Sequence, residues 1–493
     1  MKPRSCLFLA MAALLAQLPA PVFAQAAPLT PEQMSVHVLN RLAYGPRPGD
    51  IERVRKMGVA AYIDSQLQPE TMALPAALGE RLNGLETVNQ PAGQVVRAFL
   101  EARKQVRDEG DDAKEKRRLL YTRIATQAAE ARIARAIDSP RQLEEVMVDF
   151  WFNHFNVFAG KGIDRALIAS YERDAIRPYV FGSFRAMLGA TAHHPAMLFY
   201  LDNWLSTANG FTPRANAAGQ QAKASAPRRE GLNENYAREL MELHTMGVDN
   251  GYTQKDVTEL ARMLTGWTYD PRALARNNVT FVFDARRHDH GDKLWLGHAI
   301  RDQGQAEGEQ ALDVLAMHPA TAQHISYQLA QYFVRDEPPP ALVERMARTW
   351  LASNGDIGSV LRTLFASAEF AAPDSVAAKF KTPWQFVMSA ARAGSAPLVQ
   401  IEPVMGALNR LGMPLYGCQT PDGYKNTQQA WLNADALSRR IGFAAVLAKE
   451  LDPALLRSTL GGAISPATEA SIAASPQNLR AAMLLGSPDF MQR

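Results

Sequence analysis

The chain has 493 residues, of which 47% are hydrophobic and 21% charged, proportions typical of a folded globular protein rather than a disordered one. Its net charge is +3, which falls to +1 once Lys2 and Arg4 of the expected signal segment are removed. This balance gives no general field that would attract nucleic acid or an anionic membrane, so no nucleic-acid partner is expected.

Residues 1–24 have the pattern of a secretory signal peptide. A positively charged start precedes an apolar run from Cys6 to Leu18, and a small-residue cleavage site ends at Ala24. The run is too short for a membrane span. We therefore expect Sec-type export to a bacterial periplasm, with secretion as the alternative, and no transmembrane span in the mature chain.

Cys418 is the only cysteine left in the mature chain. A single thiol cannot form an internal disulfide, so stability must come from the size of the core. No obvious base lies near it in sequence, and we expect a structural thiol.

Helix signals recur along the mature chain. Thr30, Pro31 and Gln33 predict a capping box at the first helix, and residues 108–112 predict a break between two long charged helices. Further helices are expected over residues 171–189, 195–205, 307–317, 319–333, 340–353, 357–365, 383–393 and 434–447. The best strand candidate is 277–283.

These signals predict a predominantly all-α fold: a single large multi-helix domain with at most a small β element. We expect the helical domain over 25–450 and a C-terminal extension over 451–493. Residues 206–230 are rich in small and polar residues, and they predict a long flexible insertion or lid.

Residues 231–247 carry the densest concentration of Glu, Arg, Asn and His on an expected helix, ended by Gly247. At about 100° per residue, His244 falls in the middle of the buried face and the carboxylates fall on the other face or at its edge. Glu234 and Arg238 are spaced i,i+4 and are expected to pair.

His154 also lies on an apolar face, in the helix expected after Ser139 and Pro140. A buried imidazole must find a polar partner, and two interpretations stay open: a hydrogen-bonded core histidine, or a metal ligand or acid–base group. The residues of the predicted catalytic site are His154, Glu234, Arg238, Glu239, His244 and Asp256, with His154 and His244 as ligands of a divalent transition metal.

Two other polar patterns are weaker. Glu242 and His244 are at i,i+2 and point in different directions, so this spacing departs from known metal signatures. Asp256 also forms a predicted capping box with Thr253. The alternating His and Asp of residues 288–292 can bind metal, but a solvated turn is the expected structure.

Several segments together resemble the bacterial "domain of unknown function 1800" family. They include FWFNHF at 150–155, NENYARELMELH at 233–244, YTQKDV at 252–257, LTGW at 264–267 and HPATA at 318–322. The similarity runs from about His37 to Phe443. It implies one exported helical domain, often encoded beside a partner of sulfatase- or phosphatase-like character, and it implies no particular reaction.

Two functions are therefore expected as alternatives. The first is a cell-envelope enzyme whose His/Glu pocket, covered by residues 206–230, acts on an envelope polymer or a small exported substrate. The second is a non-catalytic periplasmic partner or assembly factor for the co-encoded protein. The first predicts that the site residues converge, and the second predicts separately satisfied histidines.

Overall fold

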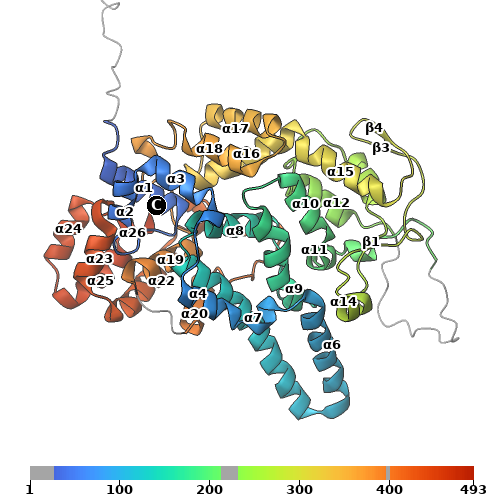
Figure 1. The fold of residues 1–493 in the computed structure, drawn as a ribbon, viewed down its shortest axis with the longest axis horizontal. Helices are drawn as coiled ribbons and strands as arrows, with labels where there is room; N and C mark the ends of the chain where they lie inside the picture. Colours follow the sequence, from blue (N-terminus) through green and yellow to red (C-terminus); the bar gives the residue numbers. More distant parts are fainter. Residues whose placement is uncertain (1–26, 213–230, 396–399) are drawn as a thin grey trace, which may run out of the picture.

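The computed structural model describes residues 27–212, 231–395 and 400–493. Helices dominate this part of the chain, and its strands are four segments of two or three residues (Figure 1). The predicted all-α class with a small β element is confirmed. The expected signal peptide and residues 213–230 of the expected insertion lie outside the described residues.

The N-terminal helices begin and end at local signals. They are α1 (Pro31–Leu42), α2 (Asp50–Met57), α3 (Val59–Gln66), α4 (Ala76–Asn83), α5 (Glu86–Asn89), α6 (Ala92–Glu109) and α7 (Asp111–Asp138). The predicted capping box of α1 is present, since Thr30 Oγ1 accepts from Gln33 N at 3.2 Å and Gln33 Oε1 accepts from Thr30 N at 2.9 Å. The chain reverses between α6 and α7 at Gly110, whose φ is +79°, and the two helices extend from the body as a hairpin (Figure 1).

The next helices carry the apolar centre of the molecule. They are α8 (Gln142–His154), α9 (Asp164–Ser170), the π-helical turn η2 (Tyr171–Ile176), the 3₁₀ turn η3 (Arg177–Tyr179), α10 (Phe184–His193), α11 (Pro195–Tyr200) and the 3₁₀ turn η4 (Asn203–Leu205). Trp151 of α8 lies 5.7 Å from Phe184, measured between ring centroids, and Phe184 lies 4.9 Å from Trp350. These fully buried rings join α8, α10 and a later helix in one core.

The small β element follows two further helices. These elements are α12 (Glu234–Glu242), α13 (Gln254–Met263), β1 (Trp267–Thr268), α14 (Pro271–Asn277), β2 (Val282–Phe283), β3 (Lys293–Trp295) and β4 (His298–Ile300). Strands β1 and β2 pair antiparallel, with Trp267 opposite Phe283, and β3 pairs antiparallel with β4. The predicted strand over 277–283 was wrong for its first part, because the helix capped by Asp270 continues to Asn277.

The last third of the chain completes the same body. Its helices are α15 (Gln305–Met317), α16 (Pro319–Phe333), α17 (Pro340–Ala352), α18 (Ile357–Phe365), α19 (Pro383–Gly394), α20 (Glu402–Arg410), α21 (Gln428–Trp431), α22 (Ala434–Leu447), α23 (Pro453–Leu460), α24 (Pro466–Ala473), α25 (Arg480–Gly486) and α26 (Pro488–Met491), with 3₁₀ turns between several of them.

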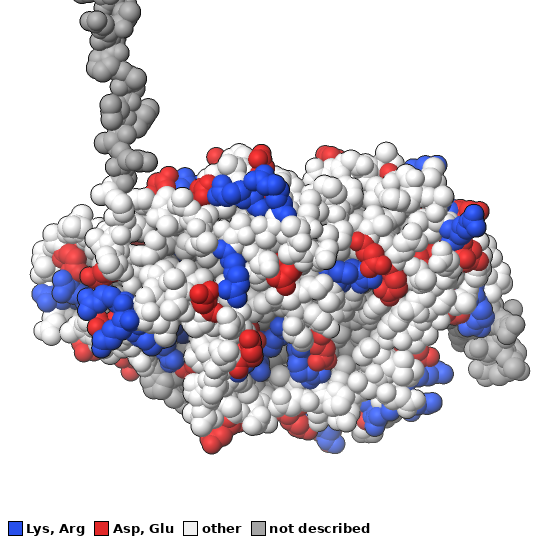
Figure 2. Space-filling view, turned by 45° about the horizontal axis from the view of Figure 1, so that its top comes forward, with Lys and Arg blue, Asp and Glu red and all other residues white. Residues whose placement is uncertain are grey.

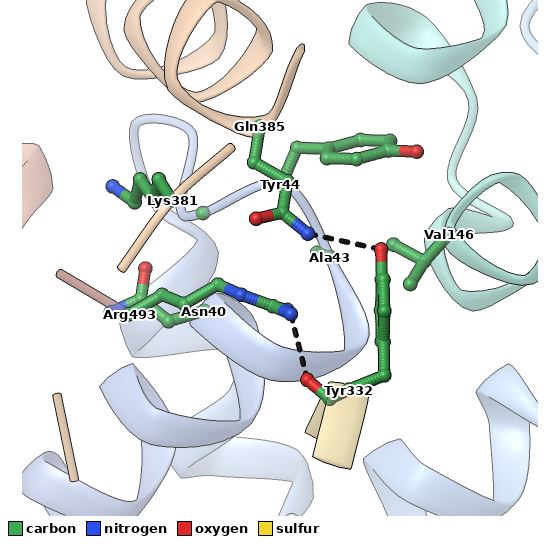
Figure 3. A pocket seen from close by; sticks show the side chains of 9 residues that line it. Asn40, Ala43, Tyr44, Val146, Tyr332, Lys381, Gln385 and Arg493 are labelled. Carbon is green, nitrogen blue, oxygen red and sulfur yellow. Dashed lines mark hydrogen bonds between the residues drawn. The ribbon is translucent and has the colours of Figure 1, made fainter. Parts of the chain in front are cut away.

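The chain end is built into the core. Arg493 N donates to Lys379 O at 2.8 Å, and Lys379 N donates to Arg493 O at 3.3 Å. Arg493 Nη2 donates to Tyr332 O at 2.7 Å, and Gln385 Nε2 donates to the Tyr332 hydroxyl at 3.0 Å (Figure 3). Residues 451–493, expected as an extension, contact α1 through the 3₁₀ turn Gly461–Ala463, α19 through α23, and α16 through Arg493.

One buried ionic network ties α7 to α8. Arg132 Nη2 lies 2.6 Å from Asp149 Oδ1, and Arg132 Nη1 lies 3.4 Å from Glu172 Oε2. The hydroxyl of Tyr416 donates to the same Glu172 oxygen at 2.7 Å. All three charged side chains are nearly removed from solvent, so each charge depends on its partners.

No helix in the described ranges is long and apolar enough to cross a membrane. On the face shown in Figure 2, basic and acidic side chains are interspersed and neither sign forms a continuous field. This agrees with the small net charge of the sequence.

Candidate functional site

His154 and His244 meet inside the molecule. His154 ends α8 and His244 lies just after α12; both are buried, and their ring centroids are 6.3 Å apart. His154 Nε2 lies 3.1 Å from the backbone oxygen of His244. Because a carbonyl only accepts, this nitrogen carries the imidazole proton.

His324 of α16 lies near His154. Gln328 Nε2 lies 3.0 Å from His324 Nε2, which therefore acts as an acceptor. Burial and His324 lower the pKa of His154 to about 4, burial and His154 lower that of His244 to about 3, and burial lowers that of His324 to about 4. We therefore expect the three imidazoles to be neutral at neutral pH; His154 and His244 are buried, and His324 is half-buried.

The predicted metal ligands have no third partner in the described part of the chain. One close group of three His, Cys, Asp or Glu side chains is found there, and it includes neither His154 nor His244. A metal ion bound by a protein normally has at least three such side-chain donors. The position of the pair fits the core-histidine interpretation better than a metal centre.

Helix α12 ends earlier than expected. It stops at Glu242, where the oxygen of Glu239 accepts from both Leu243 N at 2.9 Å and His244 N at 3.0 Å. The shared carbonyl widens the last turn and carries His244 inward. Gly247, with φ of +88°, therefore lies in the following turn and is not the cap of this helix.

The outer face of α12 carries a ladder of charges. Arg238 lies 3.5 Å from both Glu234 Oε2 and Glu242 Oε1, so the predicted i,i+4 pair is confirmed. Glu234 also accepts from Gln254 Nε2 and Thr258 Oγ1, each at 2.7 Å. Glu234 and Arg238 therefore connect α12 to α13, and their ion pairs do not involve His154 or His244.

Asp256 serves the next helix. It forms the predicted capping box with Thr253, and its Oδ1 accepts from Leu296 N at 2.9 Å. Burial raises its pKa, but hydrogen bonds from Thr253 and Leu296 outweigh burial, and the net effect lowers it. Both carboxylate oxygens are used by the fold, so Asp256 does not join the other predicted site residues.

Glu239 differs from the other carboxylates of α12. Its side chain is half-buried and forms no hydrogen bond or ion pair with any described residue. Burial raises its pKa to about 7, and the charges of Glu242 and Asp422 add to that rise. At neutral pH Glu239 therefore exists in both its protonated and ionised forms.

Asp422 is the opposite case and was missed by the sequence analysis. It lies in the loop of residues 412–427, and Lys425 Nζ is 2.7 Å from Asp422 Oδ2. Burial raises its pKa, but Lys425 and Thr420 outweigh burial and lower it. Asp422 is exposed, and its charge contributes to the raised pKa of Glu239. Two interacting carboxyls whose pKa values shift in opposite directions suit the roles of an acid and a base.

The end of α8 holds this loop in place. Asn153 Nδ2 donates to Tyr424 O at 2.9 Å, and Asn153 Oδ1 accepts from Tyr424 N at 2.7 Å. Asn156 Nδ2 donates to the backbone oxygens of Cys418 and Thr420 at 3.1 and 2.8 Å. The segment that contains His154 therefore contacts two other parts of the chain. Asn153 and Asn156 hold the 412–427 loop, and His154 holds the end of α12.

The loop approaches α8 closely at one glycine. Gly423 has φ of +65°, and a Cβ there would lie 2.3 Å from Asn153 O. Cys418, nearby, is buried as expected for a structural thiol, with its Sγ 3.7 Å from Thr420 O.

Comparison with curated proteins gives no match, and comparison with solved structures gives none. The family model described as "Protein of unknown function (DUF1800)" matches residues 37–492, which include both α12 and the 412–427 loop. The resemblance seen in the sequence is thereby confirmed. The chain belongs to the DUF1800 family.

Proposed function

We propose that the protein is an exported hydrolase of an envelope glycan that uses Glu239 as general acid and Asp422 as general base. The observation that supports this most is that the charge of Asp422 contributes to the raised pKa of Glu239, about 7, while the pKa of Asp422 itself is lowered. The signal-peptide pattern of residues 1–24 supports the envelope location.

The chemistry follows from the two protonation states. Protonated Glu239 gives its proton to the oxygen that leaves as the glycosidic bond breaks. Ionised Asp422 takes a proton from the water whose oxygen bonds to the anomeric carbon. His154 and His244 act in this scheme as positioning residues, because they connect the ends of α8 and α12.

Replacing Glu239 by Gln is expected to lower the rate about 10²- to 10⁴-fold, because an amide has no proton to give. The measurement is the release of reducing ends from purified envelope glycan between pH 5 and 9. The wild-type rate should fall above about pH 7, where Glu239 ionises, and Asp422→Asn should be similarly impaired.

Glu344→Gln is the matched control, since Glu344 is exposed on α17 and carries the same charge. It should retain the wild-type rate. Wild-type activity in Glu239→Gln, or a wild-type rate that does not fall above pH 7, would contradict the assignment.

A separate surface favours the second candidate function, binding of the co-encoded partner. A groove of about 660 Å³ runs beside α7 and α9, and no carboxylate lines it. Its lining residues are Arg117, Arg118, Tyr121, Thr122, Ala125, Thr126, Ala129, Phe158, Ala159, Gly160, Arg165, Ile168, Met405, Leu415, Tyr416 and Gly417. Its basic and apolar character suits an acidic segment of a partner protein.

Two of the arginines make no ion pair with described residues. Arg117 and Arg165 instead lie 5.9 and 5.3 Å from the ring centre of Tyr121. The double variant Arg117→Glu/Arg165→Glu is expected to abolish capture of the co-encoded partner at low salt, whereas Arg348→Glu on α17 should not. Equal capture by both variants would exclude the groove as the docking surface.

A further inference from the structure

Three chain segments meet around a buried carboxylate beside the β3–β4 hairpin, at the right of Figure 1. His288 precedes β3, Asp302 follows β4, and Glu307 lies in the first turn of α15. The side chains of His288 and Glu307 are completely buried. The solvated turn predicted for residues 288–292 was therefore wrong at His288.

The orientation of His288 is fixed on one side by a carbonyl. Its Nδ1 lies 2.9 Å from Thr265 O, which can only accept, so this nitrogen carries a proton. Its Nε2 lies 3.1 Å from Glu307 Oε1. If the imidazole is neutral, Nε2 has no proton and its lone pair faces the lone pairs of Glu307 Oε1. These two atoms repel each other unless a cation lies between them.

The same arrangement is typical of metal-binding histidines. There, one ring nitrogen donates to a backbone carbonyl, which sets the tautomer, and the other nitrogen binds the ion. Two donors bound to tetrahedral zinc at 2.0–2.1 Å lie about 3.3 Å from each other. The separation of His288 Nε2 and Glu307 Oε1, 3.1 Å, is close to this value.

Asp302 supplies the third donor. One donor atom each from His288, Asp302 and Glu307 lie within 4.8 Å of one another. We propose that these three side chains bind a divalent transition-metal ion; zinc accepts such a set of one imidazole nitrogen and two carboxylate oxygens. Three protein donors leave a fourth position for water or another ligand.

The side chains of Lys293 and His290 contact the two carboxylates of the proposed site. Lys293 Nζ lies 2.7 Å from Glu307 Oε2, and Glu307 Oε1, which faces His288, also accepts from Gln303 N at 3.1 Å. His290 Nδ1 lies 2.9 Å from Asp302 Oδ2, and His290 Nε2 lies 3.0 Å from Ala285 O. Such outer contacts orient metal-binding carboxylates. The site shares no residue with the proposed acid–base pair, so the two proposals stand independently.

The test uses the mature full-length chain without an affinity tag, stripped with a chelator and titrated with Co²⁺ and then Zn²⁺. We expect one equivalent of Co²⁺ with visible absorption bands, displaced by one equivalent of Zn²⁺. Asp302→Ala should abolish stoichiometric binding, and His290→Ala should weaken it about 10- to 100-fold.

Both variants replace exposed residues, so the fold should be retained, as circular dichroism can verify. Asp292→Ala and His298→Ala, also at exposed positions of this region, are the matched controls and should bind as the wild type does. Absence of stoichiometric binding in the wild type, or unchanged affinity in Asp302→Ala, overturns the proposal.

Discussion

Arg132→Met is expected to destabilise the protein by about 3–5 kcal/mol, the usual cost of removing one partner from a buried ionic network. The substitution keeps much of the side-chain length but leaves Asp149 and Glu172 without their shared cation. Unfolding by urea, followed by circular dichroism, measures the change in the free energy of unfolding.

Arg118→Met is the control on the same helix, because Arg118 forms only an exposed pair with Glu115. Its unfolding curve should overlay that of the wild type. Adding Asp149→Asn to Arg132→Met should restore part of the lost stability, since Asp149 loses its ion pair with Arg132 whereas Glu172 keeps one with Arg177. Equal stability of the Arg132 and Arg118 variants would show that the network contributes nothing.

Acidification from pH 7.5 to 5 is expected to destabilise the protein through its buried histidines. Burial is the main cause that lowers the pKa of each of five histidines to about 3 or 4, namely His37, His154, His194, His244 and His324. In the unfolded chain their pKa is about 6.5. The unfolded state therefore binds more protons between about pH 6.5 and 4, and stability falls as the pH falls through this window.

The expected loss at pH 5 is about 2 kcal/mol for each histidine, and carboxyls with raised pKa values, such as Glu239, oppose part of it. Urea unfolding at several pH values measures the slope of stability against pH. His324→Gln should reduce that slope by about 1.4 kcal/mol per pH unit near pH 5, whereas exposed His298→Gln should leave it unchanged. An unchanged slope in His324→Gln would mean that His324 is charged in the folded protein.

Local signals made most of the fold predictable. The predicted capping boxes at Thr30 and Thr253 are both present, because each depends on residues only three positions apart. The burial of His154 and His244 was likewise predictable from the periodicity of their own segments.

The candidate site was harder to predict because its carboxyls come from distant segments. Asp422 lies in a loop with no periodicity, and its position depends on a contact between Asn153 and Tyr424, 271 positions apart. The sequence also grouped Glu234, Arg238 and Glu239 together, although the first two join α12 to α13 and the third has a different environment. Helical spacing predicts on which face of its helix a residue lies, but not which other segments of the chain cover that face.

The acid–base account depends most directly on the protonation of Glu239. Its pKa can be measured by carbon NMR of protein labelled at the glutamate side-chain carboxyl, with Glu239→Gln identifying the signal. The account predicts a midpoint of about 7 and a lower midpoint in Asp422→Asn, because the charge of Asp422 contributes to the rise. A midpoint near 4.5, the ordinary value for glutamate, that does not respond to Asp422→Asn would contradict it.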